Sequence, residues 1–188
     1  MELSAFVLAG GSSSRMGADK ALLAFRGRTL LEYALALAGG VAASCRIVGS
    51  LEKYEKYGDV IEDAYAGQGP LAGIHAALRA TATDFNLVLA VDTPLIAPDF
   101  LRHLSARAQD SNAFVTVPRT ADSRLHPLCA VYRRSFADVA EQALREGRNK
   151  IDALFPLVPV EYVAPAAAGF DESMFVNLNT TEDLENVG

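Results

Sequence analysis

The chain contains no tryptophan and only two cysteines, Cys45 and Cys129, among its 188 residues. The two cysteines are far apart in the sequence, and neither belongs to a C-x-x-C pair or to a spacing typical of zinc sites. Both lie in apolar segments, where a free cysteine usually acts as a small buried hydrophobe. We therefore expect two reduced thiols rather than a disulfide framework or a structural zinc centre.

An excess of basic residues is also missing. The 17 lysines and arginines are outnumbered by 23 aspartates and glutamates, which gives a formal net charge of −6 at pH 7. Proteins that bind duplex nucleic acid usually carry a basic face, so we expect no nucleic-acid partner. A small anion remains a possible ligand, because a few local cations and backbone N–H groups can outweigh the global charge.

The sequence has no long hydrophobic run. The longest apolar stretches, such as residues 85–91, are interrupted and fall far below the roughly 20 residues that cross a bilayer. The first four residues, Met-Glu-Leu-Ser, do not form the basic region that opens a signal peptide. We expect a soluble, cytoplasmic protein with no membrane partner.

Apolar residues are nevertheless plentiful, at 51% of the chain, which is enough to build a core. Short apolar runs alternate with helical segments, an order that predicts βαβ units and a mostly parallel sheet with helices on both faces. The length suits one domain. The predicted strands cover residues 5–9, 45–48, 59–62, 85–91, 113–117, 128–132 and 158–163. The predicted helices cover residues 29–38, 70–80, 99–108, 136–145 and 181–187.

The first predicted strand leads into a glycine-rich loop, Leu8-Ala9-Gly10-Gly11-Ser12-Ser13-Ser14-Arg15-Met16-Gly17-Ala18-Asp19-Lys20. Ligands of α/β sheets bind beyond the carboxyl ends of strands. The glycines allow backbone N–H groups to approach a ligand, and Arg15 and Lys20 add the positive charge that phosphates require. The spacing fits neither the Walker A motif nor G-x-G-x-x-G. From the residues alone, the loop is either an anion site or a solvated turn.

Two aspartates follow other predicted strands. Asp92 ends the strongest strand, in Val91-Asp92-Thr93-Pro94, where a carboxylate could hold Mg²⁺ against phosphates or could simply cap the turn. Asp63 precedes the Gly-Pro-Leu-Ala-Gly run that ends at Gly73. Its carboxylate could accept the paired N–H donors of a guanine edge, or it could cap a turn before the helix.

The run Leu8-Ala9-Gly10-Gly11, followed by Ser-x-Arg-Met-Gly-x-Asp-Lys, resembles the signature of the nucleotidyltransferase superfamily. The continuation Asp-Lys-Ala-Leu-Leu, with Gly27 and Leu30-Leu31-Glu32 after it, is most similar to the molybdenum cofactor guanylyltransferase family. The resemblance implies a three-layer, Rossmann-like α/β fold. It also implies a single domain over residues 1–188, with a nucleotide-binding half over about 1–95 and an acceptor-binding half over about 96–188.

The resemblance further implies a Mg²⁺-dependent enzyme that transfers GMP from GTP to the terminal phosphate of molybdopterin and releases pyrophosphate. The implied catalytic residues are Arg15, Lys20 and Asp92, of which Asp92 holds the metal. The implied nucleotide-binding residues are Leu8, Ala9, Gly10, Gly11, Lys20, Asp63 and Asp92. Transient contacts with proteins that supply or receive the cofactor are also implied.

The C-terminal segment is similar to the family's Asn-x-Asn-Thr-Pro ending, with Thr181 in place of the proline. Asn177 and Asn179 alternate in this segment, so both side chains could face one pocket. The resemblance implies that they bind the pterin acceptor; the residues alone would equally allow a helix cap. His126 begins a segment similar to one near the family's acceptor pocket, but it could also be a turn residue.

One expected residue is missing. The family often places an asparagine after the second strand, where it contacts the base, whereas this strand ends in Val48-Gly49-Ser50. Base specificity is therefore less firmly implied than nucleotidyl transfer. A related cytidylyl- or sugar-phosphate nucleotidyltransferase is the main alternative, and a non-catalytic nucleotide-binding protein is a further one.

Overall fold

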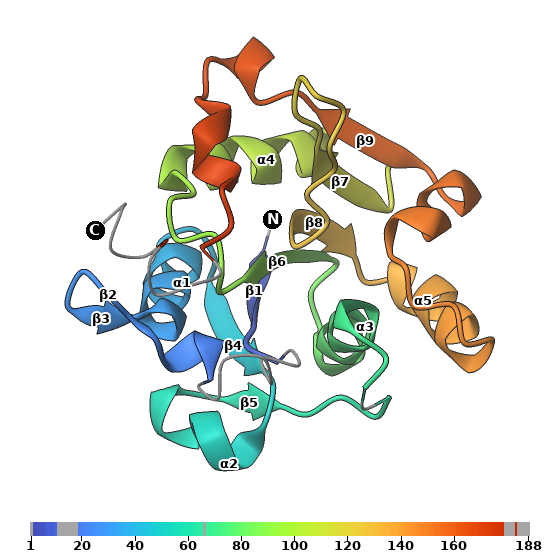
Figure 1. Cartoon of the computed structure of the whole chain (residues 1–188). Coiled ribbons are helices and arrows are strands. Elements are labelled where there is room, and N and C mark those ends of the chain that lie inside the picture. Colours follow the sequence, from blue (N-terminus) through green and yellow to red (C-terminus); the bar gives the residue numbers. More distant parts are fainter. Residues whose placement is uncertain (1, 11–18, 66, 179–182, 184–188) are drawn as a thin grey trace.

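The computed structural model describes residues 2–10, 19–65, 67–178 and 183. Seven strands form a central sheet in the order β5-β4-β1-β6-β8-β7-β9 (Figure 1). Within the described residues, β8 is the one strand of this sheet that pairs antiparallel with its neighbours, so the predicted mostly parallel sheet is confirmed. The seven strands are β1 (Leu3–Leu8), β4 (Ser44–Val48), β5 (Val60–Ile61), β6 (Phe85–Ala90), β7 (Val115–Pro118), β8 (Cys129–Arg133) and β9 (Val160–Val163).

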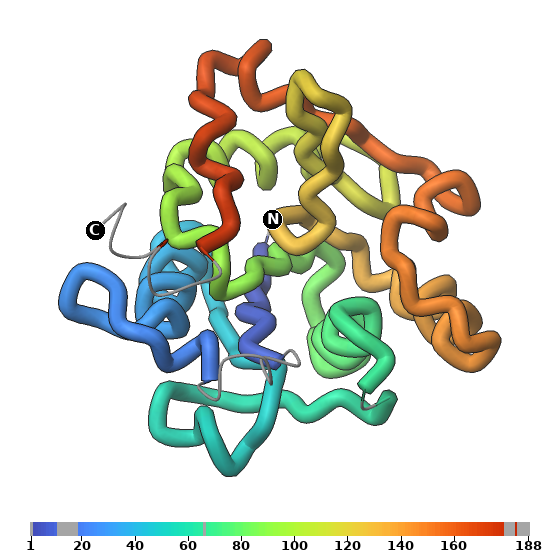
Figure 2. Tube along the Cα trace, in the orientation of Figure 1, coloured from blue at the N-terminus to red at the C-terminus, as the bar shows by residue number. Residues whose placement is uncertain are grey.

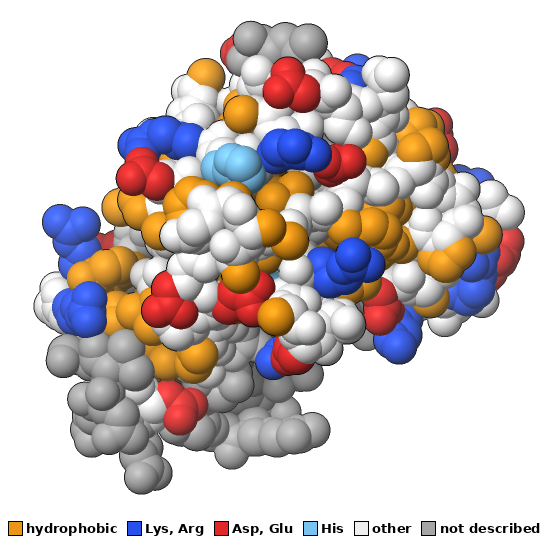
Figure 3. All heavy atoms as spheres, turned by 90° about the horizontal axis from the view of Figure 1, so that it is seen from above, with side chains coloured by type: hydrophobic (Ala, Val, Ile, Leu, Met, Phe, Trp, Pro, Cys, Tyr) orange, Lys and Arg blue, Asp and Glu red, His pale blue; other side chains and the backbone are white. Residues whose placement is uncertain are grey.

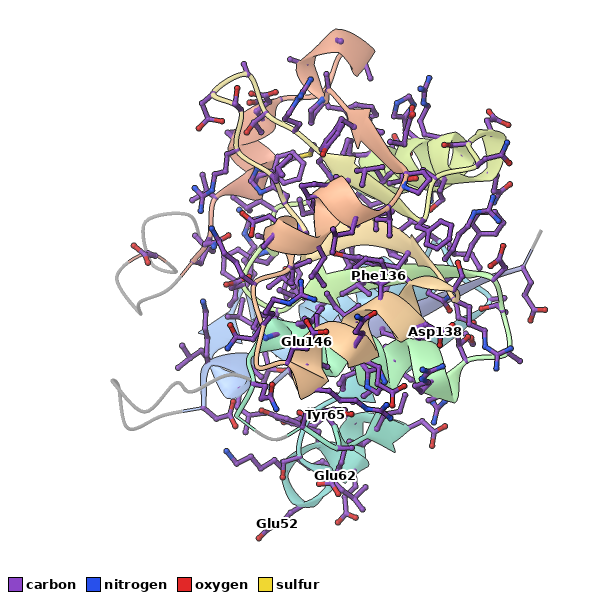
Figure 4. The ribbon with its side chains drawn as sticks, turned by 90° about the vertical axis from the view of Figure 1, so that its right-hand side faces the viewer. Glu52, Glu62, Tyr65, Phe136, Asp138 and Glu146 are labelled. Carbon is purple, nitrogen blue, oxygen red and sulfur yellow. The ribbon has the colours of Figure 1, made fainter. Side chains whose placement is uncertain are left out.

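Helices cover both faces of the sheet, which gives the predicted three layers (Figure 1). Helices α1 and α4 bury their apolar residues against one face, and α3 and α5 against the other. Figure 4 shows α5 from its own side, with Phe136 at its first turn and Glu146 directly after its end. The α-helices are α1 (Leu30–Gly39), α2 (Leu51–Tyr54), α3 (Pro70–Ala80), α4 (Pro98–Asp110) and α5 (Phe136–Arg145).

The strongest sequence signals produced the best-predicted elements. All six residues of β1 are buried, because neighbouring strands and helices on both faces cover it, and its sequence is accordingly a nearly continuous apolar run. Helix α3 begins at Pro70, whose missing N–H costs nothing in the first turn. Helix α1 begins after Thr29, which forms a capping box with Glu32. The observed bounds of α3 and α5 match the predicted 70–80 and 136–145.

The elements that sequence reasoning missed are short. They are α2, a small hairpin and several turns of 3-10 helix, all of which are too brief to show a hydrophobic period. The helix predicted over 181–187 lies outside the described residues, apart from residue 183. The missed elements other than α2 are β2 (Ala24–Phe25), β3 (Arg28–Thr29), η1 (Lys20–Leu22), η2 (Glu55–Tyr57), η3 (Asp152–Leu157), η4 (Ala166–Ala168) and η5 (Glu172–Phe175).

Both cysteines are free thiols, as predicted. Cys129 is fully buried, and burial raises the pKa of its thiol to about 12. Cys45 is only partly buried, and burial raises its pKa to about 11. Neither thiol therefore carries a significant thiolate fraction near neutral pH.

The surface seen from above mixes charges of both signs with apolar side chains, and neither sign dominates that face (Figure 3). Among the helices that the structure describes, none combines the length and apolar character that a bilayer crossing requires.

Candidate nucleotide site

Four neighbouring strands end together at one edge of the sheet. The register pairs Leu8 of β1 with Val48 of β4 and with Ala90 of β6, and it pairs Val48 with Ile61 of β5. Because these strands are parallel, the segments that follow them emerge at the same edge. Gly10 at the start of the glycine loop, the Gly49 turn, Asp63 and Asp92 therefore lie where α/β sheets bind their ligands.

Lys20 and Asp92 are in direct contact at this edge. The Lys20 Nζ atom donates to Asp92 Oδ2 over 3.1 Å, although the two residues are 72 positions apart in the sequence. Both side chains are partly accessible, at 19% for Lys20 and 23% for Asp92. The structure thus brings together a cation and a carboxylate that the sequence analysis had predicted to act on the same phosphates.

Asp19, immediately before Lys20, is held by several donors. Its carboxylate accepts the Ala21 N–H over 3.1 Å, which caps η1, and it accepts Lys53 Nζ over 3.0 Å. Both carboxylate oxygens lie 2.9 Å from the Tyr54 hydroxyl. In the sequence, Asp19 belongs to the signature that ends at Lys20 but has no implied role, and Tyr54 belongs to no motif. Only the tertiary fold shows these contacts.

The Gly49 turn explains why the asparagine expected after the second strand is absent. A Cβ atom on Gly49 would lie 2.8 Å from Cε2 of the Tyr54 ring, closer than such atoms approach one another. No side chain therefore fits at this position while Tyr54 stays where it is. Ser50 follows at the N-cap of α2, and its side chain makes no capping hydrogen bond.

The described residues that are predicted to contact the nucleotide through their backbones, Leu8, Ala9 and Gly10, differ in solvent exposure. Leu8 and Ala9 are buried, and the Ala9 N–H donates to Val48 O over 2.9 Å. The Ala9 carbonyl accepts from the Tyr54 hydroxyl over 2.9 Å. Gly10 is exposed, so its backbone is the accessible part of this segment. Gly11 and Arg15 lie outside the described residues.

Asp63 has an unsatisfied oxygen. Its Oδ1 atom is buried and has no hydrogen-bond partner among the described residues. A buried carboxylate oxygen without a donor is costly, so a ligand that supplies an N–H group would stabilise this arrangement. Its predicted role in nucleotide binding stays a prediction, but the side chain is in a suitable state for it. The Thr93 hydroxyl, beside Asp92, is buried and unsatisfied in the same way.

The C-terminal segment is attached to the same edge of the sheet. The Leu178 N–H donates to the Asp92 carbonyl over 2.8 Å, and the Leu178 side chain is buried. Asn177, the preceding residue, is exposed. The predicted acceptor residue Asn177 thus lies one position from a residue bonded to Asp92, whereas Asn179 lies outside the described residues.

His126 belongs to the long loop between β7 and β8, and its ring packs against the C-terminal segment. The ring stacks on Phe175, with centroids 4.1 Å apart and an interplanar angle of 25°. The same loop receives a second contact where Glu172 accepts the Ala121 N–H. Figure 2 shows this loop in yellow beside the red C-terminal segment. Burial, followed by the nearby Arg124, lowers the pKa of His126.

A hollow of about 770 Å³ opens beside this loop. It lies between the start of α3, the β7–β8 loop and the segment that follows α5. Arg124 and Lys150 line it, and Lys150 Nζ lies 3.6 Å from the Asp152 carboxylate, which lines it too. The β7–β8 loop therefore borders both this hollow and the C-terminal segment. The residues that line the hollow are Gly69, Pro70, Ser123, Arg124, Leu125, Pro127, Leu128, Asn149, Lys150, Ile151 and Asp152.

Comparison with solved structures places the fold among nucleotidyltransferases. The molybdopterin-guanine dinucleotide biosynthesis protein A of Archaeoglobus fulgidus superposes with a TM-score of 0.83 at 30% identity, covering 97% of this chain and 95% of that one. The 2-C-methyl-D-erythritol 4-phosphate cytidylyltransferase of Thermus thermophilus superposes with a TM-score of 0.71 at 21% identity, covering 99% and 96%. The second likeness shows the shared fold alone.

Sequence comparison identifies the family. The profile of the MobA-like NTP transferase domain matches residues 5–158. A probable molybdenum cofactor guanylyltransferase of Pelotomaculum thermopropionicum is 36% identical over 189 residues, covering 98% of this chain and 91% of the relative. One from Bacillus subtilis is 34% identical over 182 residues, covering 95% and 90%. The chain therefore belongs to the molybdenum cofactor guanylyltransferase family of MobA-like nucleotidyltransferases.

Proposed function

We propose that this nucleotidyltransferase transfers GMP from GTP to the terminal phosphate of molybdopterin cofactor, giving the guanine dinucleotide cofactor and pyrophosphate. The observation that carries the proposal is the contact between Lys20 and Asp92 at the carboxyl ends of β1 and β6, beside the exposed backbone of Gly10. The names of the curated relatives support the choice of guanine nucleotide and molybdenum cofactor.

The proposed chemistry needs positioning and charge more than a protein base. An oxygen of the acceptor phosphate is already ionised, so it attacks the α-phosphorus directly. The new P–O bond forms as the bond to the oxygen between the α- and β-phosphorus breaks, and that electron pair leaves with pyrophosphate. Lys20, together with Arg15, neutralises the β- and γ-phosphates and the charge on the leaving group.

Asp92 is the residue that would hold Mg²⁺. Within the described part of the chain, no three His, Cys, Asp or Glu side chains gather closely enough to form a metal site by themselves. Proteins often bind Mg²⁺ through one or two carboxylates, while substrate phosphates and waters supply the other ligands. Lys20 engages Oδ2 of a partly exposed carboxylate that has a second oxygen to offer. The ion would supply further neutralisation of phosphate charge.

Asp63 is the proposed contact for the base. Its buried Oδ1 lacks a donor among the described residues, and guanine presents two adjacent N–H donors that a carboxylate can accept together. Gly49 argues in the other direction, because it removes the side chain that the family often uses for this contact. Transfer of CMP is therefore the second candidate, and it rests on that substitution.

Asn177 and Asn179 are the proposed acceptor ligands. The bond from Leu178 to the Asp92 carbonyl brings the backbone of this segment to the proposed metal residue, which is where an attacking phosphate must arrive. The hollow bordered by Arg124 offers further room and a guanidinium for a phosphorylated acceptor.

The decisive experiment supplies the purified chain with Mg²⁺, a molybdopterin-bearing cofactor and one nucleoside triphosphate at a time. Pyrophosphate release and the mass of the dinucleotide product are both measured. We expect a guanine dinucleotide product with GTP, and loss of the reaction when EDTA removes divalent ions. A preference for CTP would replace the guanylyl assignment with the second candidate. GTP binding without pyrophosphate formation from any triphosphate would contradict a transferase role.

A further inference from the structure

Tyr54 connects three segments of the proposed nucleotide site. It is the last residue of the short helix α2, and it is buried, with 2% of its surface exposed. Its ring lies against Gly49, at the end of β4. Its hydroxyl lies 2.9 Å from the Ala9 carbonyl oxygen, at the end of β1, and 2.9 Å from the Asp19 carboxylate, before η1.

The contact with Ala9 determines how the next peptide N–H is presented. The carbonyl of Ala9 and the N–H of Gly10 belong to one planar peptide group, and the described chain has no cis peptide bonds. In a trans peptide these two groups point in opposite directions. Because the carbonyl points toward Tyr54, the N–H of the exposed Gly10 points away from it. The hydroxyl thus fixes the direction of a donor at the edge of the sheet.

The contact with Asp19 restrains the start of η1. Asp19 caps this turn through the Ala21 N–H, and the turn begins with Lys20. Lys53 Nζ holds the carboxylate from the α2 side, together with the Tyr54 hydroxyl, whose single proton is shared between Asp19 and the Ala9 carbonyl. The backbone that carries Lys20 is thereby attached to α2. Burial and the neighbouring Asp19 raise the pKa of Tyr54, so the hydroxyl keeps its proton at physiological pH.

We infer that Tyr54 is a positioning residue of the nucleotide site, whose hydroxyl orients the Gly10 N–H and the Lys20 turn toward one triphosphate. The inference rests on the proposed function, because it takes the ligand of this site to be a nucleoside triphosphate. Gly49 is part of the same arrangement, because only a residue without a Cβ leaves room for the Tyr54 ring.

Tyr54→Phe tests the inference, because it keeps the ring and removes the hydroxyl. We expect GTP binding, measured by calorimetry, to weaken about tenfold, because the Gly10 peptide and the Lys20 turn are no longer held in the geometry that binds the triphosphate. KM for GTP should rise, while KM for the molybdopterin acceptor should stay within about twofold and the melting temperature within a few degrees. Tyr57→Phe is the matched control, because that tyrosine lies in the next turn and its ring contacts Lys56 rather than the site.

Variants at Gly49 and Asp19 test whether Tyr54 affects GTP binding through its contacts with these two residues. Gly49→Ala should displace the Tyr54 ring and weaken GTP binding, whereas Gly39→Ala, where an added Cβ meets nothing within 4 Å, should not. In a double-mutant cycle, the loss of GTP-binding free energy in the Tyr54→Phe, Asp19→Ala double variant should be smaller than the sum of the losses in the two single variants. If the two losses in GTP-binding free energy are additive, Tyr54 does not act through Asp19.

The outcomes separate this inference from the proposed function. If the unaltered chain binds no GTP, the proposed function fails. If it binds GTP and Tyr54→Phe binds equally well, the proposed function stands and the positioning role is overturned. A Tyr54→Phe variant that loses acceptor affinity and thermal stability in the same proportion as GTP affinity would also overturn it, because that pattern is one of general destabilisation.

Discussion

The two sides of the candidate site are built differently. On the nucleotide side, the ends of β1, β4, β5 and β6 stand in register. Asp63 and Asp92 follow β5 and β6 closely, and Lys20 reaches Asp92 from η1. On the acceptor side, a long loop stacks His126 on Phe175, and a C-terminal segment is attached through Leu178 to Asp92. Strand ends therefore position Asp63 and Asp92, whereas loop packing positions the acceptor side.

This difference predicts how each side responds to change. A residue at the end of a buried parallel strand has its backbone fixed by neighbouring strands, so altering its side chain should leave the geometry intact. A residue in a packed loop depends on contacts between side chains, so its environment is more easily altered. Variants at Lys20 and Asp92 should thus separate activity from stability, and variants at the acceptor side should separate the two substrates.

The largest effect is expected at the Lys20–Asp92 pair. Asp92→Ala or Lys20→Ala should reduce transfer by a factor on the order of 10³, because each removes charge placed against the phosphates. Stability should change by less than about 1 kcal/mol, since a partly exposed ion pair contributes little to folding. Pyrophosphate release and thermal unfolding of the same preparations measure the two effects.

The matched control for this prediction is Asp99→Ala, at an exposed ion pair with Arg102 in the first turn of α4. It removes the carboxylate of another ion pair, one that is more exposed than Asp92 (82% against 23%) and lies away from the strand ends, and it should leave transfer unchanged. Full activity in a well-folded Asp92→Ala variant would contradict the metal assignment.

An intermediate effect is expected on the acceptor side. Asn177→Ala should raise KM for the molybdopterin acceptor about tenfold, which is the loss expected for one hydrogen bond of about 1.4 kcal/mol. KM for GTP should stay within about twofold, because the strand ends that bind the nucleotide are unaffected. Steady-state kinetics with each substrate varied in turn measure both constants.

Asn112→Ala provides the comparison for Asn177→Ala. Asn112 is also exposed, but it precedes β7 and so lies at the edge of the sheet opposite the carboxyl end of β6. It should alter neither constant. A rise in both KM values for Asn177→Ala would show that the two sides are not independent.

The smallest effect concerns the contact between α3, from the first half of the sequence, and α5, from the second. His75 of α3 is buried, its Nδ1 atom has no hydrogen-bond partner among the described residues, and its ring packs edge-on against Tyr65. Burial lowers the pKa of His75 and Arg79 lowers it further, while Glu141 of α5 partly opposes the shift. Figure 4 shows Tyr65 close to α5.

A lowered folded-state pKa has a definite consequence for stability. Below its usual value of 6.5, the unfolded chain binds a proton more readily at His75 than the folded chain does. The free energy of unfolding should therefore fall as pH drops from 7.5 toward 5. Glu141 stays ionised over this range, because its pKa is lowered from an ordinary value of 4.5. His126 contributes in the same direction.

Urea unfolding at several pH values measures this dependence. His75→Gln should show a smaller decrease in unfolding free energy between pH 7.5 and 5 than the unaltered chain. His103→Gln, at a partly buried histidine of α4, is measured beside it as the control for removing a histidine. Equal decreases in the His75→Gln variant and the unaltered chain would contradict the assignment to His75.

Much of the fold was predictable because its strongest elements carry local signals. The strand β6 is a nearly continuous apolar run, and α3 and α5 have a proline start and a glycine after the end, respectively. The hairpin of β2 and β3 and the helix α2 escaped prediction, because two to four residues cannot show a period. The candidate site followed the same division: Lys20, Asp63 and Asp92 were predicted, whereas Tyr54 was not.

The sequence by itself determined the family, the alternation of strands and helices, and the residues that carry charge after each strand. These are properties of neighbouring residues, and a linear pattern records them. Only the tertiary structure decided that Lys20 meets Asp92, that the Tyr54 hydroxyl reaches both Ala9 and Asp19, and that Gly49 leaves space for the Tyr54 ring. Such contacts join distant segments through strand register and packing, and their distances exist only once the chain has folded.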